Sequence, residues 1–270
     1  MHPQDDFVQL ELERTSWWHA ARRDLIREIV GEALRDKREA HILDMGGKAE
    51  LAFEPPSVSR VINQHETLAS SAFHQLHGVR NLVCTANDEL AFASNCFDVV
   101  IAGDFLQSVP DDRVALREIR RVLKDGGLLF LTAPAYSFLW GEDDERRGSY
   151  RRYRVSELRR KLTTSGFEVQ RASYFVAAGF VPLVMARMAS GIVRTSSATE
   201  RHPHSQNRFA KAAMKPLLDI ERKLLQYINL PFGTHVVCWA HKPALIAERL
   251  TIPAWERHWV SSPRLTWSGS

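Results

Sequence analysis

The sequence predicts an α/β protein with a Rossmann-like, doubly wound, seven-stranded and mostly parallel sheet, and with an inserted helical cap. Two observations predict this fold class. Short segments rich in Val, Ile, Leu and Phe recur along the chain, and the segments between them are long enough for helical crossovers. Near-continuous apolar strands that alternate with helices are typical of a parallel sheet covered on both faces. The 270 residues, 44% hydrophobic and 25% charged, suit a globular domain of this kind.

The expected elements follow one another from the amino end. Apolar residues at helical spacing predict an amphipathic helix over residues 14–34, and further helices are predicted over residues 113–123 and 155–164. The segment Asp125-Gly126-Gly127 predicts that one of the two glycines ends the second helix in the left-handed conformation. Strands are predicted at residues 41–44, 60–63, 81–84, 97–102, 128–132, 166–169 and 234–240.

Four parts of the chain are expected. Residues 1–36 form an N-terminal helical segment, and residues 37–175 with 234–243 form the α/β core. Residues 176–233 form the cap, as two helical blocks on either side of a polar run, and residues 244–270 form a tail. The acidic amino end lacks the features of a secretory signal, so a cytoplasmic location is expected. The longest uncharged stretch has 15 residues, whereas a helix needs about 20 to span a bilayer.

Charge and cysteine content point away from several classes of function. A net charge of +4 over the whole chain is mild and predicts no nucleic acid partner. Cys84, Cys96 and Cys238 are isolated and lack metal-ligand spacing, and are expected to be reduced thiols. His202 and His204 have no third ligand nearby, so no metal site is predicted.

One long segment resembles a known family. Residues 96–140 hold an FD-V strand, an acidic loop, a helix that ends R-VLK-GG, and a strand that leads to a proline. This succession resembles the second half of class I methyltransferases that use S-adenosylmethionine (SAM). Trp17-Trp18 before Arg22-Arg23, and Arg151-Arg152-Tyr153, are similar to a type 11-like bacterial subgroup, over residues 10–243 in all. The resemblance implies methyl transfer from SAM to a small-molecule or glycan acceptor.

The resemblance also implies where SAM would bind. The family loop D-x-G-x-G-x-G corresponds to residues 44–50, where Asp44 and Gly46 are in register and Lys48 and Glu50 replace later glycines. The ribose position corresponds to His65, next to Glu66, and the adenine position corresponds to Ala86, beside Asn87 and Asp88. A histidine cannot hold two ribose hydroxyls as a carboxylate does. The expected cofactor residues are Asp44, Gly46, Gly47, His65, Glu66, Asn87 and Asp104.

The catalytic positions of the subgroup differ in this chain. Its L-E-H-V is Leu106-Gln107-Ser108-Val109, and its G-H-x-R-R-Y ends at Tyr153, with Ser149 in place of the histidine. A serine has no pKa near neutrality and is not an unaided general base, although methyl transfer can proceed by proximity when the acceptor is already nucleophilic. Ser108, Ser149 and Tyr153 are the catalytic candidates.

Two further segments each have two interpretations. Arg147, Arg151 and Arg152 could bind an anionic substrate, or the basic loop could pair with the acidic residues 142–145. The apolar stretch of residues 174–193 could rest on a membrane surface, or it could be a buried cap helix.

Three functions remain open at this point. The chain could be a SAM-dependent methyltransferase, a pseudoenzyme that has lost SAM binding and acts on a protein partner, or an enzyme that uses the same crevice for a reaction without SAM. The altered residues 44–50 favour the last two functions and do not separate them.

Overall fold

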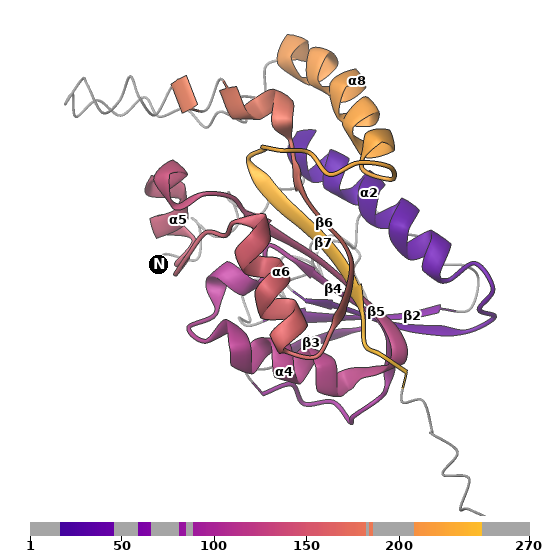
Figure 1. Cartoon of the computed structure of the whole chain (residues 1–270). Coiled ribbons are helices and arrows are strands. Elements are labelled where there is room, and N and C mark those ends of the chain that lie inside the picture. Colours follow the sequence, from indigo (N-terminus) through magenta and orange to yellow (C-terminus); the bar gives the residue numbers. More distant parts are fainter. Residues whose placement is uncertain are drawn as a thin grey trace, which may run out of the picture.

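The computed structural model describes residues 17–45, 59–65, 81–84, 89–181, 184–185 and 208–244. Seven described strands form one sheet in the order β3-β2-β1-β4-β5-β7-β6 (Figure 1). The strands are β1 (Ala40–Met45), β2 (Ser59–His65), β3 (Leu82–Cys84), β4 (Phe97–Gly103), β5 (Leu123–Pro134), β6 (Glu168–Phe175) and β7 (His235–His241). Strand β7 runs antiparallel to β5 and β6, and the other neighbouring pairs are parallel. The predicted seven-stranded, mostly parallel sheet is confirmed.

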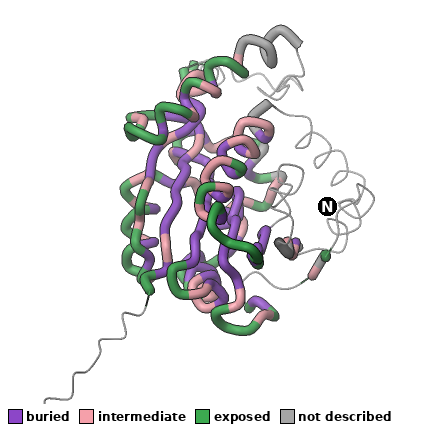
Figure 2. The backbone as a smooth tube through the Cα atoms, turned by 90° about the vertical axis from the view of Figure 1, so that its right-hand side faces the viewer, coloured by how far each residue is buried: buried purple, intermediate pink, exposed green. Residues whose placement is uncertain are grey.

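Helices cover both faces of the sheet. The longer ones are α2 (Trp17–Ala33), α4 (Asp112–Val122), α6 (Val155–Thr164) and α8 (Arg208–Leu224), and the short ones are η2 (Leu106–Ser108), η3 (Ser137–Leu139) and α5 (Glu142–Arg146). Buried side chains of α2 and α8 share one apolar cluster with Phe130 of β5, and those of α4 and α6 share a second cluster with Leu129 and Leu131. The strands between them are largely buried (Figure 2). The result is a three-layered α/β structure.

The centre of the sheet fixes where a ligand can bind. Every residue of β4 is buried, as expected for a central parallel strand. Strand order reverses between β1 and β4, which are neighbours and pair Asp44 with Ile101. In open α/β sheets the crevice at the carboxyl ends of the strands, at such a reversal, is the usual ligand site. The candidate site is therefore expected beyond Met45 and Gly103.

The glycines after α4 play a different part from the predicted one. Helix α4 ends at Val122, and Leu123 is already extended. Gly126 does take the left-handed conformation, with φ of +74°, but it lies inside β5. Leu123 pairs with Phe97 and Leu128 with Val99, so the residues between them bulge out of the β4–β5 ladder. The prediction that Gly126 or Gly127 caps the helix is wrong, because the strand begins before the glycines and uses Gly126 to form this bulge.

The second half of the expected cap lies on the sheet face. Helix α8 runs beside α2 (Figure 1), and Arg222 of α8 forms an ion pair with Glu28 of α2. The buried carboxylate of Glu221 accepts hydrogen bonds from the backbone N–H groups of Ala177 (3.1 Å) and Ala178 (2.9 Å). These two residues begin the helical residues 177–181, so Glu221 caps their helix. The polar run of the predicted cap and the tail after residue 244 lie outside the described residues.

No helix in the described ranges is long and apolar enough to cross a membrane.

The buried carboxylate of Asp98 links the amino ends of the central strands β1 and β4 through hydrogen bonds. Asp98 of β4 accepts hydrogen bonds from the His41 backbone N–H (3.0 Å), from Lys124 Nζ (2.7 Å) and from Lys37 Nζ. Burial alone would raise the pKa of Asp98, but these bonds outweigh burial and lower the pKa to about 2. Asp98 therefore stabilises the fold at pH values above the ordinary aspartate range, and this contribution is lost as the pH falls from about 4 to about 2.

We expect Asp98→Asn to lower the free energy of unfolding by about 1–2 kcal/mol at pH 7, since the ammonium groups are partly exposed. The difference from wild type should shrink between about pH 4 and pH 2, because wild-type Asp98 then becomes protonated. Urea unfolding followed by circular dichroism at several pH values measures this. Glu32→Gln, which removes an exposed ion pair with Arg35, is the control and should have no measurable effect. An Asp98→Asn difference that stays constant with pH would contradict the assignment.

Candidate functional site at the carboxyl edge of the sheet

Strained backbone marks the carboxyl edge of three strands. Asp104, Tyr136 and Val176 follow β4, β5 and β6 closely, and their φ angles are +51°, +55° and +62°. These three strands run in the same direction, so their carboxyl ends lie at one edge of the sheet. The left-handed region costs a residue other than glycine of order 1–3 kcal/mol, most clearly a β-branched residue such as Val176. Such strain gathers at functional sites, which agrees with the edge expected from the strand order.

A buried ion pair lies at the end of β4. Arg22 Nη1 of α2 lies 2.6 Å from Asp104 Oδ2, and the two side chains are only 1% and 5% exposed. The Thr132 hydroxyl of β5 donates to Asp104 Oδ1 (3.0 Å). The Asp104 N–H in turn donates to the backbone and side-chain oxygens of Thr132. Asp104, predicted from the resemblance, is thus held by groups from α2 and β5.

Gln107 adds a buried amide to this group. Its Nε2 donates to the backbone oxygen of Asp104 (2.7 Å), and the side chain is 4% exposed. Its Oε1 has no hydrogen-bond partner within the described structure, although buried polar atoms are normally paired. An unpaired buried acceptor beside a ligand crevice is suited to a donor from a ligand. Gln107 was not among the predicted site residues. It occupies the position of the glutamate in the subgroup's L-E-H-V, and that position in the motif could have identified it from the sequence.

Asp44, predicted as a cofactor residue, is a further buried polar residue near the carboxyl end of β1. It is fully buried and is the last residue but one of that strand. His19, one helical turn before Arg22 on α2, is also buried. Of the other predicted cofactor residues, His65 ends β2, whereas Gly46, Gly47, Glu66 and Asn87 lie outside the described residues. Their assignment stays a prediction.

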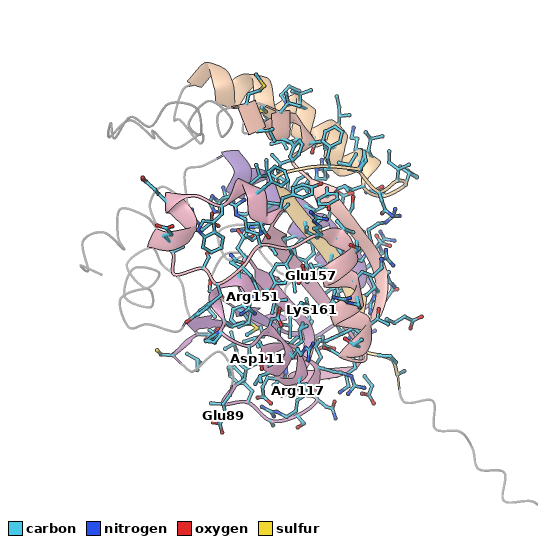
Figure 3. All side chains as sticks on the ribbon, turned by 60° about the vertical axis from the view of Figure 1, so that its left-hand side comes forward. Glu89, Asp111, Arg117, Arg151, Glu157 and Lys161 are labelled. Carbon is cyan, nitrogen blue, oxygen red and sulfur yellow. The ribbon has the colours of Figure 1, made fainter. Side chains whose placement is uncertain are left out.

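The basic loop is largely tied into the fold. Arg152 makes a two-pronged contact with Asp144, through Nε to Oδ1 (2.9 Å) and Nη2 to Oδ2 (2.8 Å), and also donates to the Ala135 oxygen. Arg151, which is labelled in Figure 3, donates to the Pro110 oxygen and lies 3.3 Å from Asp112. Arg147 is half-buried. Arg152 therefore follows the second interpretation, in which the basic loop pairs with the acidic loop residues. Anion binding by the three arginines stays a prediction.

Tyr153 is a core residue in this structure. Its side chain is fully buried, and its hydroxyl donates to Asp112 Oδ2 (2.9 Å), with the Leu106 oxygen 3.2 Å away. Burial and the Asp112 carboxylate raise the pKa of the phenol. Burial opposes ionisation of Asp112, but hydrogen bonds from Lys161 and Tyr153 outweigh it and lower the pKa of Asp112. The pair therefore ties the segment after β5 to the start of α4, and offers no proton at neutral pH.

The two serine candidates lie in loops that the structure joins. Ser108 ends η2 and Ser149 follows Gly148, and both are partly exposed. The backbone N–H of Tyr150 donates to the Gln107 oxygen (2.7 Å), so the residues next to the two serines are hydrogen-bonded. No group of three or more His, Cys, Asp and Glu side chains suited to a metal occurs in the described part of the chain. The site therefore presents hydroxyls, an amide and an ion pair.

Comparisons with known proteins agree with this geometry. Residues 53–131 match the family model of a methyltransferase domain. Together with the seven-stranded sheet, this match indicates the fold of class I methyltransferases. The matched region begins after β1 and so does not include the altered loop of residues 44–50.

Several solved structures share the fold of this chain at low sequence identity. The [4+2]-cyclase SpnF has a TM-score of 0.52 and 19% identity, over 81% of this chain and 80% of that chain. Phosphoethanolamine N-methyltransferase 2 of Haemonchus contortus, solved with SAM, has a TM-score of 0.50 and 17% identity, over 80% of this chain and 51% of that chain. A third structure is a complex of the Haloferax volcanii Trm112 methyltransferase activator with a methyltransferase. The matching chain has a TM-score of 0.51 and 15% identity, over 86% of this chain and 98% of that chain.

A curated relative matches only a short segment. Demethylmenaquinone methyltransferase of Staphylococcus aureus is 54% identical over 41 residues, which is 15% of this chain. The match spans 17% of that relative's length.

We expect Tyr153→Phe to lower the free energy of unfolding by about 1 kcal/mol, because one buried hydrogen bond to Asp112 is lost while Lys161 still pairs with that carboxylate. Chemical denaturation at pH 7 measures the change. Tyr150→Phe, on an exposed side chain of the same loop, should leave stability unchanged. Equal unfolding free energies for Tyr153→Phe and wild type would argue against a structural role and return Tyr153 to the catalytic candidates.

Proposed function

We propose that this chain transfers the methyl group of SAM to a small-molecule or glycan acceptor. The observation that carries the proposal is the group of buried polar side chains at the reversal of strand order, where Asp104, Arg22 and Gln107 lie together. A buried polar group of this kind at the ligand edge of an α/β sheet indicates a binding site better than a purely structural contact. The methyltransferase family match over residues 53–131 supports the same conclusion.

The described residues suit the amino-acid end of SAM. That end carries an ammonium, which needs acceptors, and a carboxylate, which needs donors. Asp104 and the unpaired Gln107 Oε1 are acceptors, and Arg22 is a donor. By the resemblance, Asp44, Gly46 and Gly47 would approach the methionine and ribose, with His65 or Glu66 at the ribose hydroxyls and Asn87 near adenine. Bound SAM would supply an electrophilic methyl group.

The chain's own part in the reaction is to position the reactants. Ser108 and Ser149 are not unaided bases at neutral pH, and Tyr153 is buried and paired. A bound acceptor aligned with the methyl group gains rate from proximity alone, provided that its attacking atom is already nucleophilic. We infer that the acceptor arrives at the site with such an atom. An anionic group on it would lie near Arg147 or Arg151, which are partly exposed.

A second candidate function has support from two features. The acceptor carboxylate of Asp104 is already neutralised by Arg22, and Lys48 and Glu50 stand where the family has glycines. Both features are compatible with a protein that keeps the fold without SAM. The neighbour SpnF is a [4+2]-cyclase, and the Haloferax volcanii neighbour is solved with an activator protein. A reaction without methyl transfer, a protein partner and a cytoplasmic location stay predictions for this chain.

We expect isothermal titration calorimetry to show micromolar binding of SAM and of S-adenosylhomocysteine, which share the amino-acid end. Gln107→Leu should weaken both by about tenfold or more, because a hydrogen bond to a charged group is worth about 1.5–3 kcal/mol.

Gln170→Leu, at an exposed position of β6, is the matched control and should bind like wild type. Thermal unfolding of Gln107→Leu without ligand checks that the variant folds, and a modest loss of stability of about 1 kcal/mol is expected because the hydrogen bond from Nε2 to the Asp104 oxygen is removed. Absence of binding by the wild type at millimolar SAM would overturn the proposed function, and equal affinity of wild type and Gln107→Leu would remove Gln107 from the site.

A further inference from the structure

Five aromatic side chains meet at the carboxyl edge of the sheet. The Tyr136 ring stacks on Tyr174 at 4.9 Å between centroids and 15° between planes. Phe138 and Phe180 lie 5.2 and 5.4 Å from Tyr136, and Phe232 lies 5.4 Å from Phe180. These separations are those of favourable aromatic contacts. We call Tyr136, Phe138, Tyr174, Phe180 and Phe232 the aromatic cluster.

The residues of the aromatic cluster come from four segments, and residues with positive φ angles lie in or beside two of them. Tyr136 and Phe138 follow β5, Tyr174 lies in β6, Phe180 in the helical residues 177–181, and Phe232 just before β7. Tyr136 and Val176, which both have positive φ, direct two of these segments. Gly233 packs so tightly that a Cβ there would lie 2.3 Å from the Phe175 oxygen. Strain of this kind is maintained where the arrangement serves a function.

The cluster and the polar group lie at the same edge of the sheet. Asp104 follows β4 and Tyr136 follows β5, and these strands are parallel neighbours in the sheet. The Asp104 N–H is hydrogen-bonded to Thr132 of β5, four residues before Tyr136. A ligand on the cluster would therefore lie at the edge where ligands of open α/β sheets bind.

The exposure of these rings is unusual for a purely structural cluster. Phe138 is 58% exposed and Phe232 is 41% exposed, and the other three rings are half-buried. Large aromatic side chains contribute most when they are removed from water, so a contiguous exposed group points to a ligand. This location, at the ligand edge of the sheet, favours a small molecule.

The charge near the aromatic cluster indicates which net charge a bound ring could carry. Burial and a hydrogen bond with Tyr174 raise the pKa of Tyr136, so this phenol is neutral at physiological pH. Among the described residues, the positive Arg154 acts on the Tyr136 hydroxyl in the opposite direction and lowers its pKa. A cation would be repelled by that guanidinium, whereas a neutral or anionic ring would stack on the aromatic faces without this cost.

We propose that the aromatic cluster binds the ring of a flat aromatic acceptor that is neutral or anionic. Its role as the acceptor site rests on the proposed function, whereas ring binding itself does not. The acceptor's ring would contact Phe138 and Phe232, the two most exposed members of the cluster.

The probe is 1-naphthol, a neutral flat ring system, titrated by calorimetry into the full chain with and without SAM. We expect a dissociation constant on the order of 0.1 mM, as for a small ligand of this size. Decahydro-1-naphthol, which has the same skeleton but is not flat, and N,N,N-trimethylanilinium, which is cationic, should each bind at least about threefold more weakly.

Phe138→Leu and Phe232→Leu keep an apolar side chain but remove a ring, and each should weaken 1-naphthol binding about three- to tenfold. Tyr227→Leu is the control, since Tyr227 is 78% exposed and lies after α8, and it should bind like wild type. Melting temperatures check that the variants fold.

Equal binding of 1-naphthol and decahydro-1-naphthol would show a general apolar surface and overturn the proposal. Tighter binding of trimethylanilinium, or unchanged affinity in both phenylalanine variants, would overturn it as well. Binding of 1-naphthol without binding of SAM would leave the ring site standing while the proposed function fails. Binding of SAM without binding of 1-naphthol would overturn the ring site while the proposed function stands.

Discussion

The ion pair between Arg22 and Asp104 is the interaction on which the carboxyl edge depends. It joins the first described helix to the end of the central strand, across 82 residues of chain, and both side chains are almost wholly removed from water. Removing one partner of such a pair leaves a buried charge without compensation, which costs about 3–5 kcal/mol. The sheet could have packed α2 through apolar residues alone, as Leu25, Ile26 and Val30 do further along the same helix. A buried charge pair in addition, at the strand-order reversal, is more readily explained by a ligand than by stability.

The loops around this pair are fixed by contacts that carry no catalytic chemistry. Tyr153 and Arg152 attach the segment after Gly148 to the start of α4 and to Asp144, and Gln107 holds Tyr150 through its backbone oxygen. A site that acts by positioning needs such supports, because small displacements of a reactant reduce the gain from proximity. The residues that resembled catalytic groups in the sequence therefore divide into supports, such as Tyr153, and the partly exposed Ser108 and Ser149.

The sequence predicted the framework of the fold better than the site. Helix α6 was predicted at its observed limits, since its apolar positions repeat at helical spacing, and β4 was recognisable from an apolar run too short for a helix. Gly126 was identified as left-handed but placed in a helix cap, because local sequence does not show that a strand has already begun at Leu123. The contact of Arg22 with Asp104, and the contact of Phe180 with Phe232, depend on tertiary structure. No local periodicity encodes contacts between segments so far apart in the chain.

The carboxyl edge thus has two chemically different halves on neighbouring strands. The half at β1 and β4 is polar and buried, with a carboxylate, a guanidinium and an unpaired amide oxygen, whereas the half at β5, β6 and β7 is aromatic and partly exposed. A single small ligand would not suit both, because burying its polar groups against rings costs free energy and leaving the buried acceptor unpaired costs more. Two ligands would satisfy both halves, one zwitterionic and one flat and apolar. Because β4, β5 and β6 end at the same edge, both ligands would bind at that one edge of the sheet.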